Sequence, residues 1–158
     1  MDEQLKITHR HLPHWTLPGS IYFVTFCKLT KEPFLDRERG IILAHCLHDH
    51  RKRLEMHAAV VMPELVHLLL TPWVDAAGWP LEISRILKMI KGTSARSVNE
   101  LRNSGGPVWQ DESFDHVLRS NENLHEKVEY IRQNPVRRRL VQRPEDYPWL
   151  WIGPTLMK

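Results

Sequence analysis

Two short apolar runs on either side of a proline-containing turn constrain the fold of this chain more than any other feature. The runs are Met56–Met62 and Val66–Thr71, and they flank Pro63–Glu64–Leu65. Short apolar runs bounded by turn residues are typical of strands, so the pattern predicts a hairpin of two antiparallel strands. The rest of the chain must then supply elements that pack around this hairpin.

Strands and helices are predicted to alternate along the whole chain. Ile21–Lys28 is β-branched and aromatic and predicts a strand, and Val108–Gln110 predicts a short edge strand. Apolar residues at helical spacing predict helices over about residues 37–55 and 81–101, and from 121 to just before Pro135. This order is typical of an α+β fold of the ferredoxin-like, split βαβ kind. It predicts an antiparallel sheet with helices on one face and a further C-terminal helix.

Length and composition predict one domain over residues 1–158, with a core at about 20–150. The chain has 158 residues, of which 42% are hydrophobic and 26% charged, and domains commonly have about 100–200 residues. No apolar run approaches the roughly 20 residues that a membrane-spanning helix needs. The two cysteines have no CxxC spacing, which argues against a disulfide framework or a cysteine zinc site. We expect a cytoplasmic protein with no membrane partner.

Positive charge gathers in two segments, although the formal net charge is only +3. No acidic residue interrupts the stretch from Arg132 to Arg143. Both segments are candidate surfaces for binding nucleic-acid phosphates, and solvated charged faces are the alternative. The candidate residues are Arg132, Arg137, Arg138, Arg139 and Arg143 in one segment and Arg85, Lys88, Lys91 and Arg96 in the other.

Tyr130 lies off the apolar stripe of the last predicted helix, so its phenol is expected to flank the core and reach a cleft or solvent. Lys127 and Asn134 are three residues before and four residues after it, so all three side chains can share one helical face. A phenol beside a cation can act as a covalent nucleophile toward phosphorus. A surface tyrosine that merely packs is the alternative.

His67 interrupts the second strand of the predicted hairpin. Strand alternation places it on one face with Leu65 and Leu69. It is a candidate metal ligand, and a hydrogen-bonded core histidine is the alternative.

Taken together, four blocks of the sequence resemble the successive motifs of the REP-associated tyrosine transposases, which belong to the HUH superfamily of single-strand DNA transposases. The resemblance extends from about Tyr22 to Trp149. The four blocks are Val61–Leu70, then Val108–Gln110 with Ser113–His116, then Val128–Val136, and finally Pro144–Trp149.

The resemblance implies an enzyme that cleaves and transfers single-stranded hairpin DNA. In that family the tyrosine matched by Tyr130 attacks a phosphodiester, which leaves a 5′-phosphotyrosine link and a free 3′-OH. Two histidines on one strand hold a divalent ion, Mg²⁺ or Mn²⁺. His67 matches the second histidine, Asn134 matches a further ligand position, and His116 is an additional candidate. The DNA-binding role would fall to Lys127 and both basic segments, in a monomer or a homodimer.

The sequence departs from this family at Leu65, which replaces the first metal-binding histidine. Leucine cannot coordinate a cation, and alternation is expected to point the adjacent Glu64 to the opposite face unless a β-bulge intervenes. Two hypotheses follow. The chain is a working transposase with a rebuilt metal site, or it is a relative that binds hairpin DNA without cleaving it.

Overall fold

The computed structural model describes residues 7–8, 18–118 and 121–156 of the chain, and all statements below concern these residues. A six-stranded antiparallel sheet forms the middle layer, in the order β1-β5-β2-β4-β3-β6. The strands are β1 (Ile7–Thr8), β2 (Tyr22–Lys28), β3 (Leu54–Val61), β4 (Leu65–Pro72), β5 (Trp109–Val117) and β6 (Leu150–Ile152).

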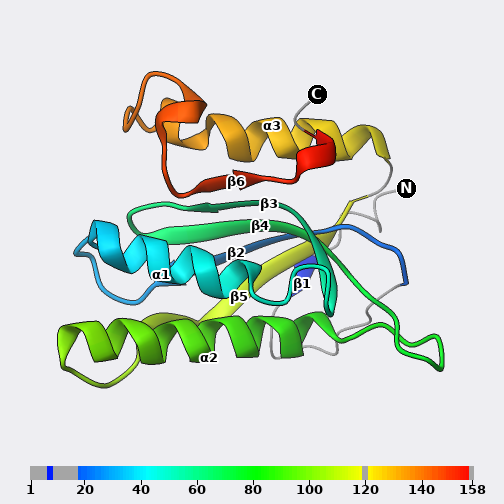
Figure 1. Cartoon of the computed structure of the whole chain (residues 1–158), viewed down its shortest axis with the longest axis horizontal. Helices are drawn as coiled ribbons and strands as arrows, with labels where there is room; N and C mark the ends of the chain where they lie inside the picture. The colour runs from blue at the N-terminus through cyan, green and yellow to red at the C-terminus, as the bar shows by residue number, and fades with distance from the viewer. Residues whose placement is uncertain (1–6, 9–17, 119–120, 157–158) are drawn as a thin grey trace.

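Three helices cover the two faces of this sheet. They are α1 (Asp36–Leu47), α2 (Ile83–Arg102) and α3 (Asn121–Arg137). Figure 1 shows α1 and α2 on one side of the sheet and α3 on the other. The inner strands β5-β2-β4-β3, linked through α1 and α2, form the predicted ferredoxin-like split βαβ arrangement. The α+β fold class is therefore confirmed, and α3 is the C-terminal helix that carries Tyr130.

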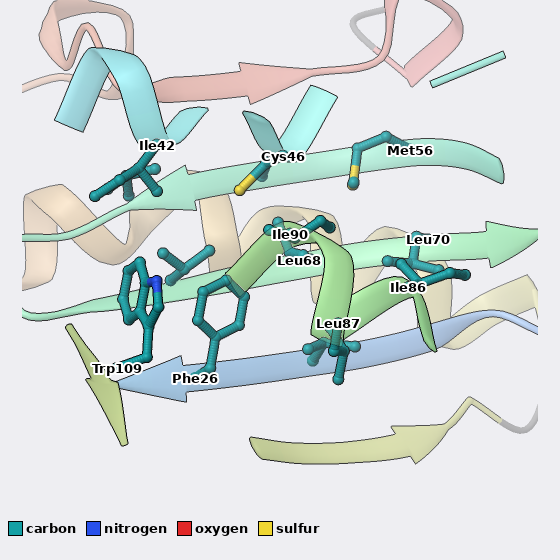
Figure 2. Packing of buried hydrophobic residues seen from close by; sticks show 14 of the residues in the cluster. Phe26, Ile42, Cys46, Met56, Leu68, Leu70, Ile86, Leu87, Ile90 and Trp109 are labelled. Carbon is teal, nitrogen blue, oxygen red and sulfur yellow. The ribbon is translucent and has the colours of Figure 1, made fainter. Parts of the chain in front are cut away.

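The sheet separates two hydrophobic cores, because alternate residues of each strand face opposite sides. The larger core lies under α1 and α2 and includes Phe26, Leu68 and Trp109, all buried (Figure 2). The smaller core lies under α3 and includes Phe23, Leu69 and Ile131. Both faces of the central strands are thus covered, which explains why the hairpin sequence is apolar at nearly every position.

Two predicted helix ends are wrong. α1 ends at Leu47 and not near residue 55, because the residues after it form a turn in which the Asp49 carbonyl accepts bonds from the backbone N–H groups of Lys52 and Arg53. Leu54 then begins β3. α3 continues through Pro135, which removes only one N–H close to the end of the helix.

The outer strands also differ from the prediction. β5 is a nine-residue strand between β1 and β2, where the sequence predicted a short edge strand. β6 pairs with β3, and the sequence pattern did not predict it. Among the described residues, no helix is long and apolar enough to cross a membrane.

Candidate functional site

The side chains of the candidate site gather around the ring of Phe23, on the sheet face that α3 covers. The strand register explains this grouping. Phe23 of β2 lies opposite His116 of β5. Thr25, the next residue of β2 on the same face of the sheet, lies opposite His67 of β4. The centroid of the Phe23 ring lies 5.3 Å from that of His67, 5.4 Å from that of His116 and 5.9 Å from that of Tyr130. Three candidates from three different elements therefore meet at one place.

Tyr130 is held at this place by the packing of α3. Val128 and Ile131 are buried against the sheet, whereas Tyr130 keeps 43% of its surface exposed. Its ring centroid lies 5.8 Å from that of His67. The helix thus fixes the phenol at the edge of the core, where it can meet a ligand from solvent.

Two cations flank the Tyr130 ring. Arg137 Cζ lies 4.3 Å from the ring centroid and Lys127 Nζ lies 5.5 Å from it. The Arg137 guanidinium also donates a hydrogen bond of 2.9 Å to the backbone carbonyl of Tyr130, which orients it. Both cations come from the helix that carries the tyrosine, so an anion approaching the phenol meets two positive charges next to the ring.

His67 is buried and neutral. Its Nδ1 lies 2.8 Å from the hydroxyl of Thr25, and only 7% of the residue is exposed. Burial, and after it the nearby positive charges of Arg137, Lys127 and Arg138, together lower the pKa of His67 from 6.5 to about 4.

Among the described residues, the side chains around Phe23 do not form a full ligand set for a divalent cation. Leu65 has no donor atom. His116 lies on β5, which β2 separates from the β4 of His67, so two strand spacings put the two backbones roughly 10 Å apart. Asn134 is buried one turn after Tyr130 and adds one amide. Within the described part of the chain, no three His, Cys, Asp or Glu side chains come together as a metal site. The nearest charges, moreover, are positive.

Glu64 does not behave as predicted. It precedes β4, so strand alternation does not apply to it, and its carboxylate forms an ion pair of 2.8 Å with Arg138 at the end of α3. Glu64 therefore faces the α3 side of the sheet. Its contact ties the start of β4 to the helix that carries Tyr130.

The two basic segments lie on different layers of the molecule. Arg137, Arg138 and Arg139 are exposed at the end of α3, near Tyr130, while Arg132 is paired with Glu129 and Glu145. The basic residues of α2 lie on the opposite side of the sheet (Figure 1). Exposed positions there are Arg85, Lys88 and Arg96.

Lys91 corrects one expectation, because it is buried and not part of a DNA-facing surface. Its ammonium donates hydrogen bonds to the carbonyls of Gln110 and Asp111 and to the hydroxyl of Ser113. The residue therefore anchors α2 to β5. Helical spacing could not reveal this, because the strand that receives those bonds was predicted to end at residue 110.

Sequence reasoning also missed Phe23 and Thr25. Both lie in a strand that was predicted, but their role depends on which residues of β4 and β5 stand opposite them. No local signal in the sequence encodes that register.

Comparison with known proteins supports the fold. No family model and no curated protein sequence matches the chain. Among solved structures, a REP-associated tyrosine transposase bound to a REP hairpin superposes with a TM-score of 0.69 and 20% identity, covering 89% of this chain and 81% of that chain. A "putative transposase" from Deinococcus radiodurans R1 gives a TM-score of 0.45 and 24% identity, covering 74% of this chain and 91% of that one. This chain thus shares the fold of the REP-associated tyrosine transposase.

Proposed function

We propose that this chain binds single-stranded hairpin DNA and cleaves it with Tyr130 as the nucleophile. The observation that carries the proposal is the half-exposed Tyr130, whose ring contacts Arg137 and Lys127 and lies beside a neutral His67. The fold shared with a transposase that was solved on a REP hairpin supports DNA as the partner.

The proposed reaction is a transfer of the phosphoryl group from DNA to the tyrosine. A new bond forms between Tyr130 Oη and phosphorus, and the bond between phosphorus and the 3′ oxygen breaks. The phenolic proton passes to the departing oxygen, which becomes a free 3′-OH, while the 5′ side stays linked to the protein. Lys127 and Arg137 favour this step because they stabilise the negative charge that builds on the phosphate oxygens. The phosphodiester energy is kept in the tyrosine link, so rejoining needs no nucleotide.

The test is covalent attachment of labelled single-stranded hairpin DNA, detected on a denaturing gel. The natural protein should form an adduct and Tyr130→Phe should form none, while both bind the hairpin with similar affinity because no charge is lost. An adduct that survives in Tyr130→Phe would refute the assignment of the nucleophile. Absence of an adduct in the natural protein would leave only the binding part of the proposal.

Binding without cleavage is the second candidate, and Leu65 favours it. Leu65 lies opposite Cys27 of β2. It occupies the position at which the REP-associated tyrosine transposases, which the sequence resembles, have a metal-binding histidine. We would therefore compare the natural protein with Leu65→His and with the matched control Leu65→Ala, each with and without Mn²⁺. An adduct that appears only in Leu65→His with Mn²⁺ would establish the second candidate. An adduct in the natural protein that resists a chelator would instead support cleavage without a metal.

Whether the cations beside Tyr130 contact DNA can be tested separately, through the salt dependence of hairpin binding. Arg137→Ala should reduce the slope of log affinity against log salt by about 0.7 to 0.9, the value for one lost phosphate contact. Arg132→Ala is the matched control, since Glu129 and Glu145 already pair with that guanidinium. An equal effect of the two variants would mean that Arg137 does not contact the DNA.

A further inference from the structure

A second surface, away from Tyr130, presents two tryptophans beside three cations. It lies in the segment between β4 and α2, where Trp79 is 71% and Trp73 is 39% exposed. Together with Lys52, Arg53 and Arg85, both tryptophans line an open cavity of about 510 Å³. Figure 1 shows this segment reaching beyond the end of the sheet at the lower right.

The loop is ordered, so the exposure of its tryptophans is built into the fold. The Asp75 carboxylate accepts hydrogen bonds of 2.9 Å from the backbone N–H groups of Ala77 and Trp79. The Asp75 N–H donates to the Trp79 carbonyl at 2.8 Å, and Val74 pairs with Pro80. Single exposed apolar residues are common on proteins, but two indoles held by such a network toward one cavity form a surface suited to a ligand.

The cations of the cavity come from the turn before β3, which carries Lys52 and Arg53, and from α2, which carries Arg85. The Trp73 N–H donates to the Arg53 carbonyl at 2.9 Å, which ties the loop to this turn. Lys52, Arg53 and Arg85 are all exposed, and the acids that share the cavity are Asp75 and Glu82. The three cations therefore outnumber the two carboxylates, and that of Asp75 is turned toward its two backbone donors.

We infer that this tryptophan loop binds an unpaired base of single-stranded DNA, with Trp79 as the stacking platform and Lys52, Arg53 and Arg85 facing the adjacent phosphates. Aromatic rings and a cationic groove are the features by which proteins hold single strands without reading their sequence. The inference rests on the proposed function in taking DNA as the ligand.

The position of the loop fits a strand that continues from the hairpin site. Pro72, where β4 ends and the loop begins, lies five residues after His67 along the strand, which corresponds to roughly 17 Å. An unpaired extension of the hairpin could therefore occupy the tryptophan loop while the phosphate to be cleaved lies at Tyr130.

The experiment compares two fluorescent probes, a hairpin with an unpaired thymidine extension and the same hairpin without it. Trp79→Leu keeps an apolar side chain but loses the aromatic face, and Trp79→Phe keeps a smaller aromatic face. We expect Trp79→Leu to weaken binding of the extended probe about fivefold or more, as for loss of one stacked base. Trp79→Phe should retain most of the affinity, and the hairpin without extension should bind all three proteins equally.

An extension of abasic sugars separates stacking from phosphate contacts. Trp79→Leu and the natural protein should bind this probe equally, and a loss of the same size on it would overturn the inference. Equal binding of the extended thymidine probe by both proteins would overturn it as well. So would a change from dimer to monomer in Trp79→Leu with unchanged DNA binding, because the loop would then be a contact between copies of this chain.

An unpaired thymidine oligonucleotide keeps this test distinct from that of the proposed function. If the natural protein binds the oligonucleotide and Trp79→Leu does not, the tryptophan loop is supported even where no hairpin binding or covalent adduct is found. If the hairpin forms an adduct but the protein does not bind the oligonucleotide and the extension adds nothing to hairpin affinity, the inference fails and the proposed function stands.

Discussion

His67 should make the protein less stable as the solution becomes acidic. Burial, followed by the charges of Arg137, Lys127 and Arg138, lowers its pKa from 6.5 to about 4 in the folded protein. In the unfolded chain the imidazole returns to a pKa of about 6.5. As the pH falls, the unfolded state therefore takes up the proton before the folded state does. The free energy of unfolding, which His67 hardly affects near neutral pH, decreases as the pH falls from 6.5 toward 4.

The size of this effect follows from linkage, since one unit of pKa difference corresponds to about 1.4 kcal/mol. With pKa values of 6.5 unfolded and about 4 folded, His67 should remove roughly 2 kcal/mol between about pH 7 and pH 5, and roughly 3 kcal/mol by about pH 4. This is a large part of the stability of an ordinary domain.

The assay is urea denaturation over this pH range for the natural protein and for His67→Gln. Glutamine cannot titrate and can still form a hydrogen bond with Thr25, so the difference between the two curves isolates the imidazole. His45, His57 and His116, whose pKa values are also lowered by burial, remain in both proteins and cancel. Parallel pH dependences, or a His67 ring that titrates near its ordinary pKa by NMR, would refute the reasoning.

Three further substitutions test polar contacts elsewhere in the fold. Arg102→Ala should cost about 3 kcal/mol in urea denaturation, because it leaves the buried Glu38 carboxylate without its guanidinium partner. Since the hydrogen bond from Arg102 holds the pKa of Glu38 below its ordinary value, this cost should shrink as the pH falls through the carboxylate range. Tyr147→Phe removes the buried 2.7 Å hydrogen bond to the Val61 carbonyl and should cost about 1 kcal/mol, which a thermal melt detects as a drop of roughly 2–4 °C. Lys91→Met should leave hairpin affinity unchanged in a binding titration, because the ammonium forms its hydrogen bonds with β5 inside the protein.

Much of the fold could be predicted because hydrophobic pattern and chain order both constrain it. The hairpin of β3 and β4 is apolar on both faces, and only a sheet covered on both sides accommodates that. The boundaries were harder to predict. Leu54 continues the helical spacing of α1 but belongs to β3, and α3 passes Pro135 because buried side chains around it favour continuing the helix. Tertiary packing outweighed local preference at both places.

The candidate site was predictable to the extent that it lies on single elements. The face of Tyr130 on α3 and the face of His67 on β4 both follow from periodicity. That these faces meet around Phe23 depends on which strands are neighbours, and Glu64 reached Arg138 because the strand begins one residue after it. Lys91 is a second example, because the spacing of a lysine along a helix does not indicate whether its ammonium faces solvent or binds a strand.

The tyrosine with its cations and the position of Leu65 are held by different elements of the fold, so a change at position 65 need not disturb the tyrosine. Tyr130, Lys127 and Arg137 are positioned by α3, through the packing of Val128 and Ile131 on the sheet. Leu65 lies in β4 opposite Cys27, where an apolar side chain packs with the same core. Loss of a donor at position 65 therefore leaves the phenol and its cations in place. The proposed phosphate contacts of Lys127 and Arg137 therefore do not depend on a metal ligand at position 65, which is why DNA affinity and strand cleavage must be measured as separate properties of this chain.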